Sequence, residues 1–191
     1  MVKDTRKIVQ ALNYIACSQV GGVVNCMKAY KLLWLADRYH LRQYGRTVSG
    51  DEYHALPHGP VPSDAMSIIE GVPTKLPPYY PKDEYVRRRS RYSFASVQKP
   101  DLDVFSESDR EALDLILEKY GKMSPQELSE FSHSFPEWKA YEHMIADPAL
   151  KNGYKIDMDL FFENLEVEDD VFNDSPELLA LTKELFHQYV C

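Results

Sequence analysis

The chain has 191 residues, of which 44% are hydrophobic and 27% are charged, and this balance excludes a largely disordered protein. The net charge of −8 argues against a general nucleic-acid binder, because neutralising phosphate groups requires lysine and arginine. The three cysteines form no CxxC pair, and the sequence shows neither a secretory leader nor an apolar run of about 18 residues. We therefore expect a cytoplasmic protein with no membrane partner.

The negative charge is concentrated near the end of the sequence. Residues 150–191 contain 3 basic and 10 acidic side chains, whereas residues 1–149 are nearly neutral. We therefore predict a domain over residues 1–149, followed by an acidic C-terminal extension over residues 150–191 that ends in a helix.

Local signals divide the first part of the chain into helices and short extended segments. Asp4 or Thr5 can cap a first helix, Asn25 can cap a second helix that Gly45 ends, and Ser63 can cap a third. The predicted elements are a helix over 4–18, a helix over 26–44, extended segments over 46–48 and 51–56, a stiff proline loop over 57–62 and a helix over 64–71.

The second of these helices is apolar on most sides, which is typical of a central helix with other elements packed around it. Its one stripe predicted to face water contains Lys28, Lys31, Arg38 and Arg42. Asp37 and His40 fall inside the apolar arc, so we predict that both are buried and hydrogen-bonded. The expected partner of Asp37 is an arginine, either Arg46 or one within residues 87–91.

The rest of the chain is predicted to add a short β part and more helices. An irregular loop over 72–84 precedes an extended segment over 85–97, with 51–56 as one pairing partner. Strand alternation places Arg87, Arg89 and Arg91 on one side and Val86, Arg88, Tyr92 and Phe94 on the other. Further helices are predicted over 107–120 and 125–133, from 136 and from 176, with an anchoring turn at 160–162. The expected fold is mainly α (α+β): a helical domain around a central buried helix, with a small antiparallel β-sheet or hairpin.

Two groups of polar residues raise the question of catalysis or metal binding. His54 and His58 are four residues apart, but Pro57 lies between them and spoils the helical geometry of a shared metal site. Asp37, His40 and Asp51 resemble an acid–base set, but no nucleophile motif, phosphate-binding loop or dinucleotide fingerprint accompanies them. We therefore predict no enzyme activity and no catalytic, cofactor or metal site.

The sharpest charge run contains Arg87, Arg89 and Arg91. With the helices over 107–120 and 125–133 it could form the basic wing of a winged helix-turn-helix, which makes a DNA-binding regulator the alternative function. The second of those helices carries Glu127 and Glu130 and no lysine or arginine, so nucleic-acid binding is not favoured.

These arginines also suit recognition of a protein. Arginine and tyrosine are common at the energetic centres of interfaces, and a stiff proline loop loses little entropy on binding. The predicted partner-binding residues are Tyr53, His58, Pro60, Val61, Pro62, Arg87, Arg89 and Arg91.

An ordered series of motifs resembles the SocA-like antitoxin domain, also called Panacea, which includes phage-associated proteins of the GepA type. The series comprises KLLWLADRYH at 31–40, Gly45-Arg46, Gly50-Asp51, Tyr53, HGPVP at 58–62, Pro100-Asp101, LDVFS at 102–106, Tyr120-Gly121, Ser124-Pro125, Leu128 and Trp138. The resemblance covers about residues 5–145.

The resemblance implies a mostly helical domain with a small β element and a non-enzymatic role. A protein of this family binds and neutralises a cognate toxin, and some relatives instead deliver the toxin to a protease as an adaptor. The resemblance carries over no catalytic residue. For the acidic extension, three roles remain open: it covers a basic toxin surface, it docks on its own domain, or it forms a contact in a homodimer.

Overall fold

The computed structural model describes residues 4–72, 80–145 and 153–190, which contain eight α-helices, six short strands and four 3-10 turns. In chain order these are α1 (Thr5–Cys17), η1 (Val20–Gly22), β1 (Val23–Asn25), α2 (Cys26–Tyr44), β2 (Tyr53–Leu56), β3 (Gly59–Pro62), α3 (Ser63–Glu70), η2 (Lys82–Glu84), β4 (Val86–Ser90), β5 (Ser93–Ser96), η3 (Leu102–Val104), α4 (Glu107–Tyr120), α5 (Pro125–Ser132), α6 (Pro136–Lys139), α7 (Glu142–Ile145), β6 (Tyr154–Lys155), η4 (Met158–Phe162) and α8 (Pro176–Val190). The predicted class, mainly α with a small antiparallel β part, is confirmed.

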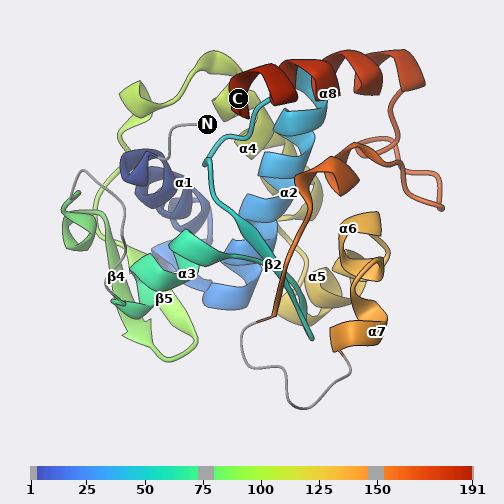
Figure 1. Cartoon of the computed structure of the whole chain (residues 1–191). Helices are drawn as coiled ribbons and strands as arrows, with labels where there is room; N and C mark the ends of the chain where they lie inside the picture. Colours follow the sequence, from blue (N-terminus) through green and yellow to red (C-terminus); the bar gives the residue numbers. More distant parts are fainter. Residues whose placement is uncertain (1–3, 73–79, 146–152, 191) are drawn as a thin grey trace.

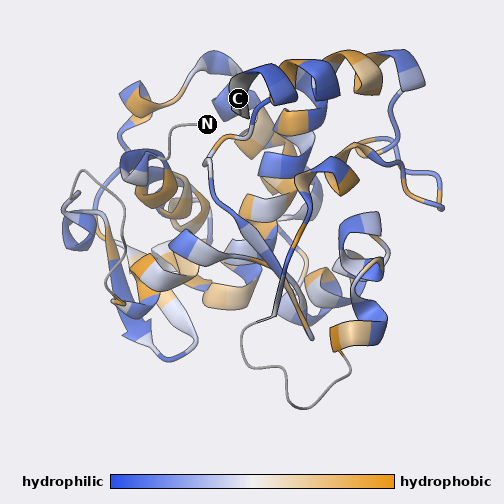
Figure 2. Cartoon of the chain, viewed as in Figure 1, coloured by the Kyte–Doolittle hydropathy of each residue, from blue (hydrophilic) through white to orange (hydrophobic). Residues whose placement is uncertain are grey.

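Helix α2 runs through the middle of the molecule. Helix α1 and strands β4 and β5 lie on one side of it, α5 to α7 lie on the other, and α8 crosses its C-terminal end (Figure 1). Apolar and polar residues alternate along the outer helices α1 and α8, as expected for helices with one face on the core (Figure 2). Every helix in the described ranges is too short or too polar to cross a bilayer.

The ends of α2 are fixed by the residues that the sequence indicated. The Asn25 side chain accepts the backbone N–H of Lys28, and Gly45 ends the helix with φ of 69°. A Cβ on Gly45 would lie 2.7 Å from Cβ of Leu185 in α8, so glycine also allows the close packing of the two helices. The predicted central helix over 26–44 is confirmed.

The strands form two three-stranded antiparallel sheets, in the orders β1-β5-β4 and β3-β2-β6. The predicted pairing of 51–56 with 85–97 is therefore wrong, because β2 pairs with β3 and β6 while β5 pairs with β1 and β4. The segment 85–97 is a hairpin that turns at Arg91 and Tyr92, and 46–48 forms bends instead of a strand. Of the loop predicted over 72–84, residues 73–79 lie outside the described residues.

The proline-rich segment 57–62 is only partly a loop. Pro57 and His58 form the turn, and Gly59–Pro62 is strand β3, which pairs Pro60 with Ala55 and Pro62 with Tyr53. Proline is tolerated here because β3 lies at the edge of its sheet. The prediction of a loop through residue 62 is corrected accordingly.

The stripe of α2 that was predicted to face water is largely covered. Lys31, Arg38 and Arg42 are fully buried, and only Lys28 is partly exposed. Arg38 Nε donates to Glu137 Oε1 at 2.9 Å, and its guanidinium lies 5.0 Å and 5.3 Å from the ring centres of Phe135 and Phe172. Burial raises the pKa of Glu137, while the adjacent Arg38 opposes that rise.

Arg42 holds the C-terminal segment against α2. Its Nη1 donates to the carbonyl oxygens of Phe161 and Glu163 at 2.9 Å and 2.8 Å, and its Nε donates to Asp174 Oδ2 at 2.8 Å. Phe161, Phe162 and Phe172 are buried, which confirms the predicted anchoring turn at 160–162. Three roles were left open for the C-terminal extension. In the structure the extension is docked on its own chain, against α2.

Candidate functional site

Asp37 and His40 are both buried, as predicted, but Asp37 has no arginine partner. It accepts hydrogen bonds from the backbone N–H and hydroxyl of Ser49 and, at 2.6 Å, from the hydroxyl of Tyr53. Burial raises the pKa of Asp37 to about 6, and these donors oppose the rise. The predicted arginine pair is wrong because hydroxyl and amide donors satisfy this carboxylate.

His40 makes structural contacts that are separate from those of Asp37. Its Nδ1 lies 2.7 Å from the carbonyl oxygen of Arg46, and its Nε2 lies 3.0 Å from Oγ of Ser108. Burial lowers the pKa of His40 to about 4. A neutral ring that donates from Nδ1 and accepts at Nε2 satisfies both partners, so His40 fixes the segment after α2 against α4.

Asp51 replaces the predicted Ser63 as the cap of α3. Its carboxylate accepts the backbone N–H groups of Asp64 and Ala65 at 2.9 Å and 2.8 Å, while Ser63 Oγ bonds to His54 Nδ1 at 2.6 Å. Burial raises the pKa of Asp51 to about 7. Asp37, His40 and Asp51 thus bind three different sets of partners and do not assemble as an acid–base set. In residues 4–72, 80–145 and 153–190, no three His, Cys, Asp or Glu side chains gather in a metal-binding group.

A surface with open space for a ligand or partner lies at the N-terminal end of α2. A cavity of about 690 Å³ and an apolar pocket of about 290 Å³ adjoin there and share the residues Cys26, Met27, His58 and Tyr92. We call the two together the α2 groove. Its other lining residues are Asn25, Pro125, Gln126, Ser129, Glu130 and His133 in the cavity, and Tyr30, Lys31, Leu56, Pro57, Val61 and Met66 in the pocket.

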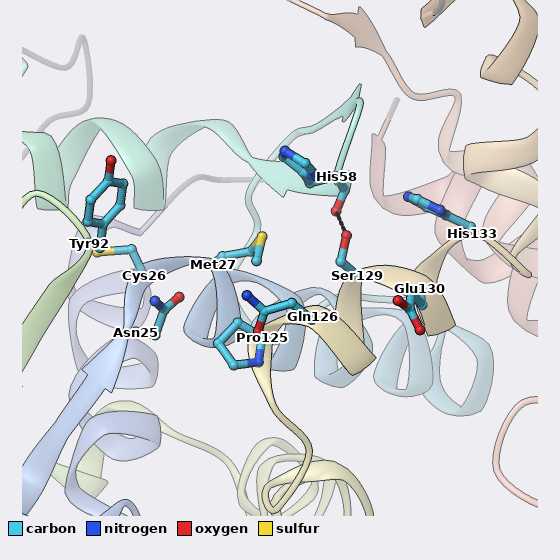
Figure 3. Close-up of a pocket in the computed structure, with 10 residues that line it drawn as sticks. All are labelled: Asn25, Cys26, Met27, His58, Tyr92, Pro125, Gln126, Ser129, Glu130 and His133. Atoms are coloured by element: carbon cyan, nitrogen blue, oxygen red, sulfur yellow. Dashed lines mark hydrogen bonds between the residues drawn. The ribbon is translucent and has the colours of Figure 1, made fainter.

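Three side-chain hydrogen bonds hold the β2–β3 hairpin at the edge of this groove. Ser129 Oγ donates to the carbonyl oxygen of His58 at 3.0 Å, the bond drawn in Figure 3. Lys31 Nζ donates to the Pro60 carbonyl oxygen at 2.6 Å, and Trp138 Nε1 donates to that of Leu56 at 2.9 Å. The side chain of His58 is exposed. The turn that carries it is held by these bonds to the carbonyl oxygens of residues 56, 58 and 60.

Lys31 lines the apolar pocket and carries a buried amine. Burial lowers the pKa of Lys31 well below its ordinary value. Its amine is committed to the Pro60 carbonyl, and its hydrocarbon stem is what lines the pocket. The lysine therefore positions the hairpin and contributes an apolar wall.

The β4–β5 turn forms the opposite edge of the groove. Tyr92 is 64% exposed, and the guanidinium of Arg91 lies 5.5 Å from the centre of its ring. Arg87 and Arg89 are also exposed, on β4 of the same hairpin. Figure 3 shows Tyr92 and His58 on either side of Met27, with the side chains of α5 beyond Met27.

The predicted partner-binding residues fall into two classes. His58 and Val61 line the α2 groove, and Arg87, Arg89 and Arg91 are exposed on the β4–β5 hairpin, whose Tyr92 lines it. Tyr53, Pro60 and Pro62 are buried, so the expectation that their side chains face outward is wrong. Tyr53 is inward because its hydroxyl belongs to the Asp37 network, and the two prolines are inward because they form part of β3.

The sequence alone does not indicate that Tyr92, Met27 or the α5 residues are parts of a site. Alternation along one continuous strand placed Tyr92 on the side of Phe94, whereas the hairpin turn projects it into solvent. The turn residues Arg91 and Tyr92 include no glycine, asparagine or proline, so no local signal marks them.

Comparison with protein families gives a match to the model described as "Antitoxin SocA-like, Panacea domain", over residues 30–139. The match runs from within α2 to the end of α6 and includes both hairpins and α5. Comparisons with curated proteins and with solved structures gave no significant match. Because the family model covers more than half of the chain, the protein belongs to the SocA-like antitoxin family that is defined by the Panacea domain.

Proposed function

We propose that this protein is the antitoxin of a bacterial or phage toxin–antitoxin pair and that it neutralises its cognate toxin by direct binding. The observation that carries the proposal is the family match over residues 30–139. That region includes the β2–β3 hairpin, α3, the β4–β5 turn and α5, all of which line the α2 groove.

The α2 groove is the proposed toxin-binding surface. Its edges are held by hydrogen bonds before any partner arrives, so binding loses little conformational entropy. It exposes Tyr92 and His58, and Arg91 lies against the Tyr92 ring; tyrosine and arginine often dominate interface energies. The C-terminal extension is a weaker candidate, since its anchoring residues are already bound to α2.

The test is co-expression with each neighbouring open reading frame. We expect one neighbour to stop growth when expressed alone, to be harmless when this protein is present, and to co-purify with it. The double variant His58→Ala/Tyr92→Ala should reduce the co-purified toxin by about tenfold or more. The matched control is Val167→Ala/Leu181→Ala, which removes two exposed side chains in the C-terminal extension and should change nothing.

Two results separate the parts of this proposal. If every neighbour is harmless without this protein and none co-purifies, the antitoxin role fails. If neutralisation is unaffected by the His58 and Tyr92 substitutions, the antitoxin role stands and the groove is not its surface. Toxin abundance also distinguishes simple binding from delivery to a protease, because only delivery lowers the toxin level, and only in a host that retains the protease.

The alternative function, a DNA-binding regulator, is favoured by the exposure of Arg87, Arg89 and Arg91. Against it, α5 directs Gln126 and Glu130 toward the groove and carries no basic residue. A regulator would be retained on duplex DNA at low salt and released by replacing the three arginines with alanine. The absence of retention at low salt would remove this alternative.

A further inference from the structure

The composition of the α2 groove indicates what kind of segment it can bind. We propose that the groove takes an acidic segment of the toxin, with one large apolar side chain in the 290 Å³ pocket and carboxylates over the β4–β5 hairpin. This inference rests on the proposed antitoxin function and adds to it the chemistry of the bound segment.

The pocket fits a single side chain. Its walls include Met27, Tyr30, Val61, Met66 and Tyr92, all apolar or aromatic. Its volume of about 290 Å³ is at the lower limit of pockets that bind whole small molecules, so it suits one aromatic or long aliphatic residue. Methionine walls adapt to the shape of an inserted residue, because the thioether chain is flexible and polarisable.

The β4–β5 hairpin, whose Tyr92 lines the pocket, carries arginines that the chain itself does not neutralise. Arg6, Arg38, Arg42 and Arg46 each form an ion pair with a carboxylate of this protein. Among the described residues, Arg87, Arg89 and Arg91 have no ion pair. In a protein of net charge −8, this local excess of positive charge is complementary to an acidic partner.

A fourth arginine links the charged hairpin to the pocket. Arg88 Nη1 donates to the carbonyl oxygen of Glu70 at 3.5 Å, and its Nε donates to that of Ser90 at 3.0 Å. Its positive charge also acts on Cys26, where it opposes the rise that burial causes in the thiol pKa. The hairpin charge therefore reaches the wall of the pocket.

The negative charge on the opposite wall of the groove determines the orientation in which the segment can bind. Glu130 and Gln126 of α5 line the wider cavity, and Glu130 would repel carboxylates placed there. The acidic residues of the segment should lie toward β4, and neutral or basic residues should lie toward α5. A nucleic acid has a uniform negative charge and would meet this glutamate, so a protein segment is the better fit.

The test uses the full-length protein and a random peptide library displayed on phage, so it does not require the toxin to be known. We expect selection to enrich peptides in which several aspartates or glutamates flank one Phe, Trp, Leu or Met. The triple variant Arg87→Gln/Arg89→Gln/Arg91→Gln should bind the selected peptides about tenfold more weakly. The control Lys119→Gln/Lys139→Gln/Lys183→Gln changes the net charge equally on α4, α6 and α8 and should leave binding unchanged.

A pocket-filling variant separates the apolar anchor from the charges. Met27→Trp should abolish peptide binding, and Tyr92→Ala, whose parent side chain is mostly exposed, should weaken it without a change in thermal unfolding. The proposal is overturned if no peptide is enriched, if the enriched peptides lack acidic residues, or if neither variant affects them. It is also overturned if the protein binds a short DNA duplex through the three arginines and Met27→Trp has no effect on that binding.

Competition with the toxin connects this inference to the antitoxin role. Saturating purified toxin should displace the selected peptides, and peptides that remain bound would overturn the assignment of the groove to the toxin. A failed co-expression test with successful peptide selection would remove the antitoxin role and leave the acidic-segment site in place. The two failures are therefore distinguishable.

Discussion

Replacing Arg42 with alanine is expected to lower the free energy of unfolding by about 3–5 kcal/mol and to release the segment 158–174 from α2. Arg42 is fully buried and supplies donors to Asp174, to the carbonyl oxygens of Phe161 and Glu163, and to the side chain of Asn164. Its removal would leave buried acceptors without donors, and that penalty exceeds the energy of any single bond.

Denaturant unfolding gives the free energy, and hydrogen exchange of peptides from 158–174 reports the release of the segment. Arg42→Lys keeps the charge but loses the planar fork, so it should fall between wild type and alanine. The control is Arg6→Ala, which breaks an exposed pair with Asp4 and should have little effect. Equal unfolding curves for Arg42→Ala and Arg6→Ala would show that the extension is not held by this arginine.

Gly59→Ala is expected to have the second large effect and to lower the free energy of unfolding by roughly 2–5 kcal/mol. Gly59 has a φ of +95°, which disfavours any side chain, and a Cβ there would overlap Ser132 Oγ and lie 2.7 Å from Lys31 Nζ. To relieve this overlap, either the Ser132 and Lys31 side chains shift and lose their bonds to the Ser129 and Pro60 carbonyl oxygens, or the β2–β3 hairpin moves away from α5 and breaks the bond from Ser129 to His58. Toxin binding should therefore weaken together with stability.

Gly71→Ala is the matched control for this substitution. Gly71 also has a positive φ of 74°, but a Cβ there would meet no atom within 4 Å. Gly71→Ala should therefore lower the free energy of unfolding only through backbone strain, by about 1–2 kcal/mol, and should leave toxin binding unchanged. If Gly59→Ala were no more destabilising than Gly71→Ala, the contacts of the hairpin with Lys31 and Ser132 would not be close enough to matter.

The helices of this fold could be predicted because their ends carry local signals. Ser106 and Ser124 form capping boxes with Asp109 and Glu127, and the helices begin immediately after them, as expected. The cap and terminal glycine of α2 are equally local. Such signals depend on residues within four positions of one another, so the sequence alone reveals them.

The environment of the α2 stripe could not be predicted because it depends on distant residues. A helical wheel shows Lys31, Arg38 and Arg42 as a polar stripe, and polar stripes usually face water. Their partners, such as Glu137 and Asp174, lie about a hundred residues or more away in the chain and reach α2 only after folding. The α2 groove could not be predicted for the same reason, because its parts are far apart in the sequence. Tyr92 and α5 reach the N-terminal end of α2 through tertiary packing that no local motif indicates.

The most direct test of toxin binding at the α2 groove is hydrogen exchange of the protein alone and in its complex with the co-expressed toxin. We expect slower exchange in the complex for residues 56–61, 88–93 and 125–133, which surround the groove. Helix α8 lies at the other end of α2, about 28 Å away for a helix of 19 residues, and should exchange at an unchanged rate. Slower exchange confined to α8 and the C-terminal extension, with none around the groove, would contradict binding at this surface.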